Sequence, residues 1–350
     1  MPRRPRRPVF EKYDISKSPF AQRPTQRDLG ELLGENRNNL RLLVDYKEQF
    51  VVRRQEVIGK HQKVRDLKYP VSRLRAVHER LKFHLNKIKQ PSYLFSPRKN
   101  RGQRDNALRH VNQDQYLTLD LKQFYPSTTA TMVRRWFQDE LGMYPDVAGL
   151  LTHLSTIDDR VSFGSPLTPV LCTLIHRAMF DEIAGVCERR GLRCTLWVDD
   201  LTISGKFIPG ELVNEIREII RAAGLRSHKV RYRTGNRPVF ITGIGVVGSK
   251  LTAPNAVHLK IKSLWDDYHQ AETLEEKESC SQLLLSQLGS LKHIVGAASL
   301  AGRKASDQMN ALRQQRRKMH VAATAAAAAK RLSRALMPKE SPEDVPFEIS

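Results

Sequence analysis

The sequence predicts an α+β fold, because the chain contains both short runs of β-formers and longer amphipathic helical segments. The clearest β-signal lies in 193–205, where two runs rich in β-formers flank the adjacent acids Asp199 and Asp200. That pattern is typical of a tight hairpin with both carboxylates at its tip. The clearest helical spacing lies in 71–88 and 171–186. With 350 residues, the chain can bury a sizeable core in one large domain or in two to three subdomains.

The chain is strongly basic, with a formal net charge of +22 at pH 7. Its basic residues cluster, which favours a polyanionic partner such as nucleic acid over a protein merely kept soluble by its charge. The four cysteines form no CxxC pair, so we expect reduced thiols rather than disulfides or a zinc site. The basic N-terminus leads into no apolar run, and no segment reaches membrane-spanning length. We therefore expect a cytoplasmic protein without a membrane partner.

The N-terminal part begins with a basic arm, residues 1–27, which is rich in Arg and Pro. A helix is predicted over 28–46, and two strands over 49–54 and 63–67 are joined across Gly59-Lys60. Cations lie on both strands of this hairpin. That is typical of a solvated sheet edge and, near a phosphate site, of a clamp.

The middle of the chain carries basic residues first and an acid next. The basic stretch 91–109, a loop or the start of a helix, interleaves aromatic residues with arginines, which suits a nucleic-acid backbone and its bases, or simple solvation. Residues 116–121 form a short apolar strand in which Asp120 is out of place for stability, so Asp120 is a candidate active-site residue. A turn at 124–126 and a helix through Leu141 follow.

The C-terminal part continues with a helix over 211–223 and strands over 230–233 and 239–247. From about residue 254 the chain is expected to be helical and basic. Residues 336–350 are acidic, and we expect them to be disordered.

Three carboxylates emerge as candidates for chemistry: Asp120, Asp199 and Asp200. Taken alone, the adjacent pair is equally compatible with a solvated turn. Together with Asp120, in a basic protein, the three can bind two Mg²⁺ ions that activate an attacking hydroxyl and stabilise departing oxygens in phosphoryl transfer. The cations of the hairpin within 49–67 would then neutralise a triphosphate from the other side.

The order of motifs between about residues 46 and 250 resembles that of reverse transcriptases. The stretch 120–127 resembles the first catalytic palm motif, in which an aromatic residue follows the aspartate by five positions. The loop 164–169 resembles the template- and nucleotide-positioning loop. Residues 197–200 resemble the tyrosine-x-Asp-Asp signature, with Trp-Val in place of the usual Tyr-Ala. Residues 65–70 match the fingers pattern Arg-x-Ile-x-x-Pro, with Leu for Ile.

Two shorter elements resemble retron reverse transcriptases in particular. Residues 106–110 match the Asn-Ala-x-x-His element of that group, and 241–243 lie where it has Val-Thr-Gly. The resemblance implies an RNA-directed DNA polymerase that copies a structured non-coding RNA into a linked DNA from dNTPs. Synthesis would begin at a 3′ end or at a 2′-OH of a guanosine in that RNA. A role in antiviral defence beside an effector protein is commonly implied as well.

The resemblance also implies the roles of individual residues. Asp120, Asp199 and Asp200 would be catalytic Mg²⁺ ligands, with the backbone carbonyl of Leu121 beside them. Lys229 lies where the family carries a lysine near the triphosphate, and Tyr125 matches the steric gate that disfavours a 2′-OH. The nucleotide-binding set is Arg65, Tyr125, Phe163, Gly164 and Lys229. The RNA-binding set is Asn106, His110, Arg313, Arg316 and Arg317, and for the first two a hydrogen-bonded structural pair is an equal alternative.

The fold implied by the resemblance is a right-hand polymerase. Its fingers would be residues 28–115 with an insertion at about 128–165, its palm 116–253, with an antiparallel sheet backed by helices, and its helical basic thumb 254–335. Two alternatives stay open for the function. One is another defence-associated or intron-related reverse transcriptase, and the other is a non-catalytic RNA-binding scaffold with the same fold.

Overall fold

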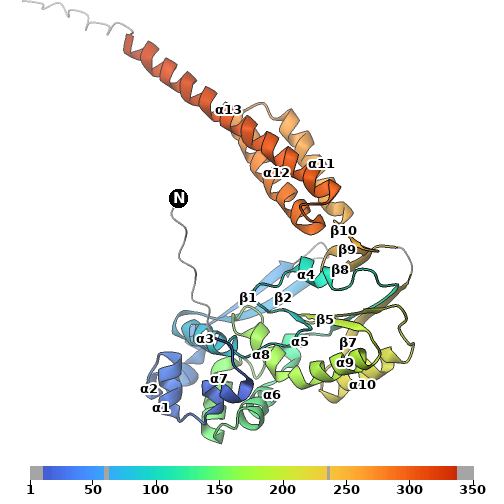
Figure 1. Cartoon of the computed structure of the whole chain (residues 1–350). Coiled ribbons are helices and arrows are strands. Elements are labelled where there is room, and N and C mark those ends of the chain that lie inside the picture. Colours follow the sequence, from blue (N-terminus) through green and yellow to red (C-terminus); the bar gives the residue numbers. More distant parts are fainter. Residues whose placement is uncertain (1–10, 59–62, 235–236, 337–350) are drawn as a thin grey trace, which may run out of the picture. The chain divides into compact units, whose positions relative to one another are not determined.

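The computed structural model describes residues 11–58, 63–234 and 237–336 (Figure 1). Residues 1–10 of the predicted basic arm, the hairpin turn at Gly59-Lys60 and nearly all of the predicted acidic tail lie outside these residues. The rest of the arm packs onto the protein, with Phe20 buried in the core. The protein is a mixed α+β structure with 56% helix, which confirms the α+β part of the predicted fold class. The chain divides into two compact units. The first comprises residues 1–242 and 246–249, and the second comprises residues 243–245 and 250–350.

The first unit is built on a five-stranded sheet with the strand order β3-β5-β6-β4-β7. Its strands are β3 (Leu94–Ser96), β4 (Gln115–Leu121), β5 (Arg193–Trp197), β6 (Asp200–Gly205) and β7 (Ser227–Thr234). Strands β3 and β5 are parallel, whereas the other pairs are antiparallel. The sheet is therefore mixed rather than purely antiparallel.

Alternate residues of β4 separate the two faces of this sheet. Leu117, Leu119 and Leu121 point into the hydrophobic core, to which helices also contribute. Tyr116, Thr118 and Asp120 therefore lie on the opposite face. The helices of the core include α8 (Thr168–Ile175), α9 (Arg177–Arg189) and α10 (Leu212–Ala222), and Figure 1 shows α9 and α10 side by side near β5 and β7.

Two predicted long helices are each broken in two. The segment predicted as 28–46 forms α1 (Gln26–Leu33) and α2 (Arg37–Asp45), because Gly34 adopts a left-handed φ of 73° and ends the first helix. The segment predicted as 171–186 breaks at His176, whose Nε2 lies 3.0 Å from the Thr128 hydroxyl. Neither tertiary contact nor cap geometry was evident from the apolar spacing.

The remaining helices of the first unit pack largely against one another, and α3 also contacts β2. They are α3 (Ser72–Leu85), α4 (Gln103–Leu108), α5 (Phe124–Ser127), α6 (Ala130–Arg135) and α7 (Pro145–Ser155), with a π-helical turn at Trp136–Glu140 and 3₁₀ turns at Ile15–Lys17, Pro19–Ala21 and Lys47–Phe50. A separate antiparallel pair, β1 (Val51–Ile58) and β2 (Lys63–Pro70), forms the predicted cationic hairpin with longer strands than expected.

The second unit is mainly three helices, α11 (Asn255–Gln270), α12 (Leu274–Val295) and α13 (Leu300–Leu336), packed through Leu264, Leu284, Leu288 and Leu312. Three short strands follow one another where the chain passes between the units: β8 (Val239–Ile241) in the first unit, β9 (Ile244–Val247) with residues in both, and β10 (Lys250–Thr252) in the second. They form a sheet in the order β10-β9-β8. The predicted strand 239–247 is interrupted because Thr242 and Gly243 both have positive φ. Among the described helices, none is long and apolar enough to cross a membrane.

Candidate active site

The three predicted carboxylates come together at one end of the central sheet. Asp120 is paired directly opposite Asp200 in the β4–β6 register, and Asp199 lies in the turn between β5 and β6. One carboxylate oxygen from each residue lies within 4.8 Å of the others. Clustered carboxylate oxygens are the ligands that Mg²⁺ prefers. This donor set therefore fits the expected metal.

The hairpin tip is held by backbone hydrogen bonds from two sides. The Val198 N–H donates to the Ser96 carbonyl over 3.0 Å, and the Leu121 N–H donates to the Asp199 carbonyl over 3.0 Å. Val198 has a φ of 61°, which a β-branched residue rarely adopts. A strained turn of this kind persists only where its surroundings fix it, and such turns cluster at functional sites.

A lysine lies against the carboxylates. Lys229 Nζ is 3.0 Å from Asp120 Oδ2 and donates a hydrogen bond to it. The pKa of Asp200 is raised, first because its carboxyl is desolvated by the surrounding protein and second because the Asp120 charge is close, while Lys229 opposes the shift. The site thus concentrates negative charge that one ammonium only partly compensates.

A β-bulge directs Lys229 toward Asp120. In the β4–β7 pairing, Asp120 is opposite His228 and Thr118 is opposite Arg231. Lys229 and Val230 therefore face the single residue Leu119, and Lys229 has a left-handed φ of 48°. Bulges of this kind redirect side chains and are common beside active sites. The sequence resemblance had indicated Lys229, but not the bulge that positions it.

The predicted steric gate packs against a second aromatic residue. The rings of Tyr125 and Phe163 are 5.3 Å apart in an edge-to-face arrangement. The pKa of Tyr125 is raised, mainly because its hydroxyl is desolvated, with smaller effects from Cys172 and Asp199. The predicted gate residue therefore packs against a second aromatic ring and lies close enough to Asp199 for that charge to contribute to its raised pKa.

Gly164 is required by a protein contact. It has a φ of 92°, and a Cβ added there would lie 3.0 Å from Tyr69 Cβ. Tyr69 belongs to β2, so the glycine lets the 164–169 loop approach the cationic hairpin. The predicted reason, close approach of template or nucleotide, stays a prediction.

Asn106 and His110 lie in the interior. His110 is fully buried, with its Nδ1 2.6 Å from the Ser204 hydroxyl and its Nε2 2.7 Å from the Thr195 hydroxyl. Burial lowers its pKa to about 3. Asn106 is also buried. His110 is thus hydrogen-bonded within the protein, whereas the buried Oδ1 and Nδ2 of Asn106 have no hydrogen-bond partner among the described residues. The two do not form a hydrogen-bonded pair in this structure, and RNA contact by either stays a prediction.

The other predicted cations have different surroundings. The backbone of Arg65 lies opposite Glu56 in the β1–β2 register, but its side chain is not among the parts of the chain that the structure describes. Arg313 and Arg317 are exposed on α13. Arg316 is half-buried and donates to Glu278 of α12 over 2.9 Å, so it is engaged within the helical unit.

Two residues of the site region carried no signal in the sequence. His78 of α3 lies with Nδ1 2.6 Å from the Ser165 hydroxyl and Nε2 2.7 Å from the Leu154 carbonyl, so it supports the 164–169 loop. Asp158 pairs with Arg53 over 2.9 Å and with Lys68 over 2.7 Å, so it links β1 and β2 to the loop after α7. Partners far apart in the sequence could be found only from the fold.

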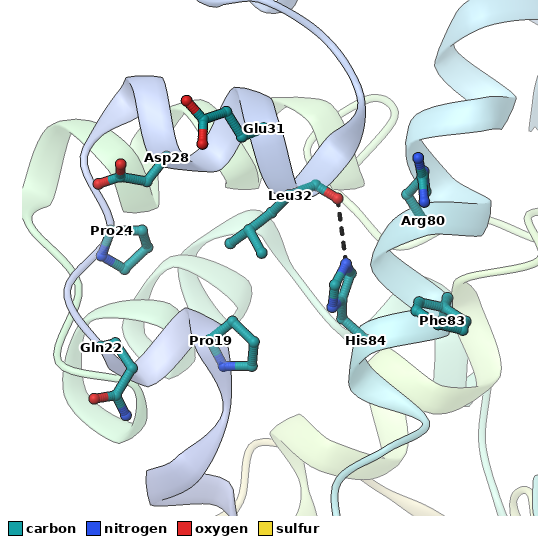
Figure 2. Close-up of a pocket in the computed structure, with 9 residues that line it drawn as sticks. All are labelled: Pro19, Gln22, Pro24, Asp28, Glu31, Leu32, Arg80, Phe83 and His84. Carbon is teal, nitrogen blue, oxygen red and sulfur yellow. Dashed lines mark hydrogen bonds between the residues drawn. The ribbon is translucent and has the colours of Figure 1, made fainter. Parts of the chain in front are cut away.

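A surface cavity of about 520 Å³ lies away from these residues (Figure 2). It is formed by α1, α3 and the 3₁₀ turn Pro19–Ala21, and it combines the apolar Leu32 and Phe83 with the acid Asp28 and with Arg80. His84 Nε2 donates to the Leu32 carbonyl over 3.2 Å at its wall. None of the predicted site residues lines it, so the carboxylate cluster is the candidate site.

The curated proteins to which the chain is similar are reverse transcriptases. The retron Ec86 reverse transcriptase of Escherichia coli is 30% identical over 170 residues, which are 48% of this chain and 52% of that protein. The retron Se72 reverse transcriptase of Salmonella heidelberg is 26% identical over 177 residues, 50% of this chain and 47% of that protein. The retron Ec48 reverse transcriptase of Escherichia coli is 22% identical over 241 residues, 64% of this chain and 58% of that protein.

These similarities make the chain a distant homologue of retron reverse transcriptases. The chain spans about half the length of the curated relatives it matches. No family model matches it.

Proposed function

We propose that the chain is an RNA-directed DNA polymerase of the retron type. The observation that carries this proposal is the pairing of Asp120 opposite Asp200 with Asp199 at the adjacent tip, all within 4.8 Å. Three carboxylates this close repel one another, and a turn that is merely solvated has no reason to bring them together. A metal-dependent phosphoryl-transfer site does, because its metal ions bind such carboxylates. The similarity to retron reverse transcriptases supports the substrate class.

In the proposed mechanism, Asp120, Asp199 and Asp200 hold Mg²⁺, with the Leu121 carbonyl beside them. The bound metal would supply positive charge to the attacking hydroxyl and to the departing pyrophosphate. Tyr125, backed by Phe163, excludes a 2′-OH from the sugar position. Lys229 donates a hydrogen bond to Asp120 and is positioned to stabilise or protonate the leaving group. Gly164 and Arg65 would complete the nucleotide site.

The proposed architecture is a right-hand polymerase. The fingers would comprise 28–115 and the insertion 128–165, the palm 116–127 and 166–253, and the thumb 254–335. The cationic β1–β2 hairpin would contact the triphosphate. The exposed Arg313 and Arg317 of α13 would contact the phosphates of a structured RNA stem.

The proposed partners are a structured non-coding RNA, its linked DNA product, dNTPs and an effector protein in antiviral defence. Another defence-associated or intron-related reverse transcriptase would share the polymerase chemistry but not the linked RNA. An inverted-repeat non-coding RNA encoded upstream of the gene would favour the retron type over that alternative.

The decisive experiment is to purify the protein with its bound nucleic acid and to sequence what is retained. A single structured RNA joined to DNA is expected. A random RNA population without linked DNA would contradict the retron assignment. The scaffold alternative is tested by replacing Asp199 and Asp200 with Asn, because unchanged DNA synthesis and biological activity would favour it.

A further inference from the structure

The edge strand β7 carries an unusual concentration of positive charge. Between residues 225 and 238 the sequence has five Lys and Arg residues and no Asp or Glu. The side chains of Arg231, Tyr232 and Arg233 are all exposed. Within the described part of the chain, Arg231 and Arg233 have no ion pair, whereas Lys229 is paired with Asp120. Solubility alone does not require this excess of positive over negative charge, so the strand is a candidate for binding an anion.

The bulge at Lys229 and Val230 decides which face these arginines occupy. Unbroken alternation from His228 would place Val230 on the carboxylate face and Arg231 on the core face. With the extra residue, Val230 packs against the hydrophobic core instead. Arg231 then lies opposite Thr118, which shares a face with Asp120. The same one-residue shift that directs Lys229 to Asp120 thus redirects the arginines.

The resulting row of cations leads away from the carboxylates. Arg231 is opposite Thr118, two residues before Asp120, and Arg233 is opposite Tyr116, four residues before it. Each two-residue step along a strand covers about 7 Å. A nucleic-acid strand carries one phosphate per roughly 3.4 Å of duplex axis, so the two arginines span about two phosphate spacings. The exposed Tyr232 projects from the other face of the same strand.

We infer that Arg231 and Arg233 form a backbone-binding track for the template–primer duplex, beside the carboxylate site and continuous with Lys229. The partner is the phosphodiester backbone of the duplex, because guanidinium groups bind phosphate well and the acid-free strand offers them no competing carboxylate. This inference rests on the proposed polymerase function, since the duplex end must lie at Asp120, Asp199 and Asp200.

The test is the affinity of the full chain for an annealed RNA–DNA primer–template, measured at several salt concentrations. For the double variant Arg231→Ala/Arg233→Ala we expect roughly tenfold weaker binding at moderate salt, and a slope of log affinity against log salt that is smaller by about 2. The conservative Arg231→Lys/Arg233→Lys should restore most of the slope, because lysine also neutralises phosphate. The matched control is Arg134→Ala/Arg217→Ala, which removes two exposed arginines from α6 and α10.

An unchanged duplex affinity and salt slope in the Arg231/Arg233 variant, with unaltered thermal stability, would overturn the track. A higher KM for dNTP with unchanged duplex affinity would also overturn the track, because Arg231 and Arg233 would then contribute to nucleotide binding and not to duplex binding. Primer extension by the wild type on the same duplex separates the two proposals. If the wild type binds the duplex but never extends it, the proposed polymerase activity is contradicted. The proposed binding track is then still tested by the affinity and salt dependence of the Arg231/Arg233 variant.

Discussion

Lys229 Nζ lies 3.0 Å from Asp120 Oδ2, so an ammonium group is hydrogen-bonded to a predicted ligand of the catalytic metal. The contact exists because a bulge in β7 gives Lys229 a left-handed backbone and directs its side chain to the carboxylates. In the absence of metal, this lysine offsets part of the repulsion between Asp120 and Asp200. It also competes with any cation that binds there.

Replacing Lys229 with Met should therefore strengthen metal binding by a few-fold, since an exposed ion pair contributes about 1 kcal/mol or less. The metal-free protein should become less stable, because the carboxylates lose their compensating charge. Calorimetric titration with Mn²⁺ and thermal unfolding without metal measure the two effects. Lys206→Met is the control, because Lys206 pairs with Asp114 over 3.3 Å, away from the cluster. Weaker Mn²⁺ binding by the Lys229 variant would show that lysine does not compete with the metal.

Asp200→Asn should separate stability from activity. The folded-state pKa of Asp200 is raised, so its charged form is disfavoured in the fold and stability falls as pH rises through the unfolded and then the folded pKa. A neutral amide removes that penalty, so the variant's metal-free Tm at pH 8 should exceed that of the wild type. DNA synthesis should fall by at least about 100-fold, as when a key electrostatic group is removed from an active site. A variant that is less stable without metal would contradict the assigned repulsion.

Tyr125 should set the preference for deoxynucleotides through its ring. Tyr125→Ala opens the sugar position and should raise the relative efficiency of ribonucleotide incorporation by roughly tenfold or more. Tyr125→Phe keeps the ring and its packing on Phe163, so its selectivity should match the wild type. Competitive primer extension with dNTPs and rNTPs measures both. Equal selectivity in all three proteins would remove Tyr125 from the gate role.

The acidic residues of this site could be predicted from the sequence, whereas the backbone and tertiary contacts that position the site residues could not. Asp120, Asp199 and Asp200 could be identified because strand and hairpin signals are local and the acids interrupt them. The bulge at Lys229 could not, since alternation in Val230 to Arg233 fits either face of a sheet. The motif match identified His110, but only the fold shows that Ser204 and Thr195 enclose it. Helix breaks at Gly34 and His176 depended on cap and tertiary geometry that apolar spacing does not encode.

Asp158 should position the cationic hairpin. It bridges Arg53 and Lys68, which are directly opposed on β1 and β2 and would otherwise repel each other. The pKa of Asp158 is lowered, chiefly by the hydrogen bond from Lys68. Asp158→Asn should therefore loosen the hairpin and raise KM for dNTP about three- to tenfold, with kcat at saturation retained.

Glu48→Gln is the matched control for Asp158→Asn. It removes one carboxylate that contacts Arg53 but leaves the bridge between the strands intact, so KM for dNTP should change little. Hydrogen exchange of β1 and β2 amides reports the hairpin directly, and we expect faster exchange only in the Asp158 variant. Equal KM values and equal exchange in the two variants would mean that Asp158 is not a positioning residue.

Buried histidines should make the protein sensitive to acid. Burial lowers the pKa of His110 to about 3 and that of His78 to about 4, so both are neutral in the fold and bind protons in the unfolded chain below about pH 6.5. Their contribution to stability is complete above pH 6.5 and is lost as pH falls toward the folded pKa values. The free energy of unfolding should then drop by up to about 1.4 kcal/mol per pH unit for each histidine.

His110→Gln tests this dependence. The variant should be less stable at pH 8, because glutamine cannot reproduce both contacts with Ser204 and Thr195, yet it should lose less stability between pH 6.5 and 4.5. His153→Gln, at an exposed position, should follow the wild type throughout. Denaturant unfolding at a series of pH values measures the slopes. Removing a buried neutral histidine must lower by one the number of protons that the unfolded chain binds in excess of the folded protein at low pH. If the His110 variant and the wild type show the same slope of unfolding free energy against pH, the acid sensitivity originates elsewhere.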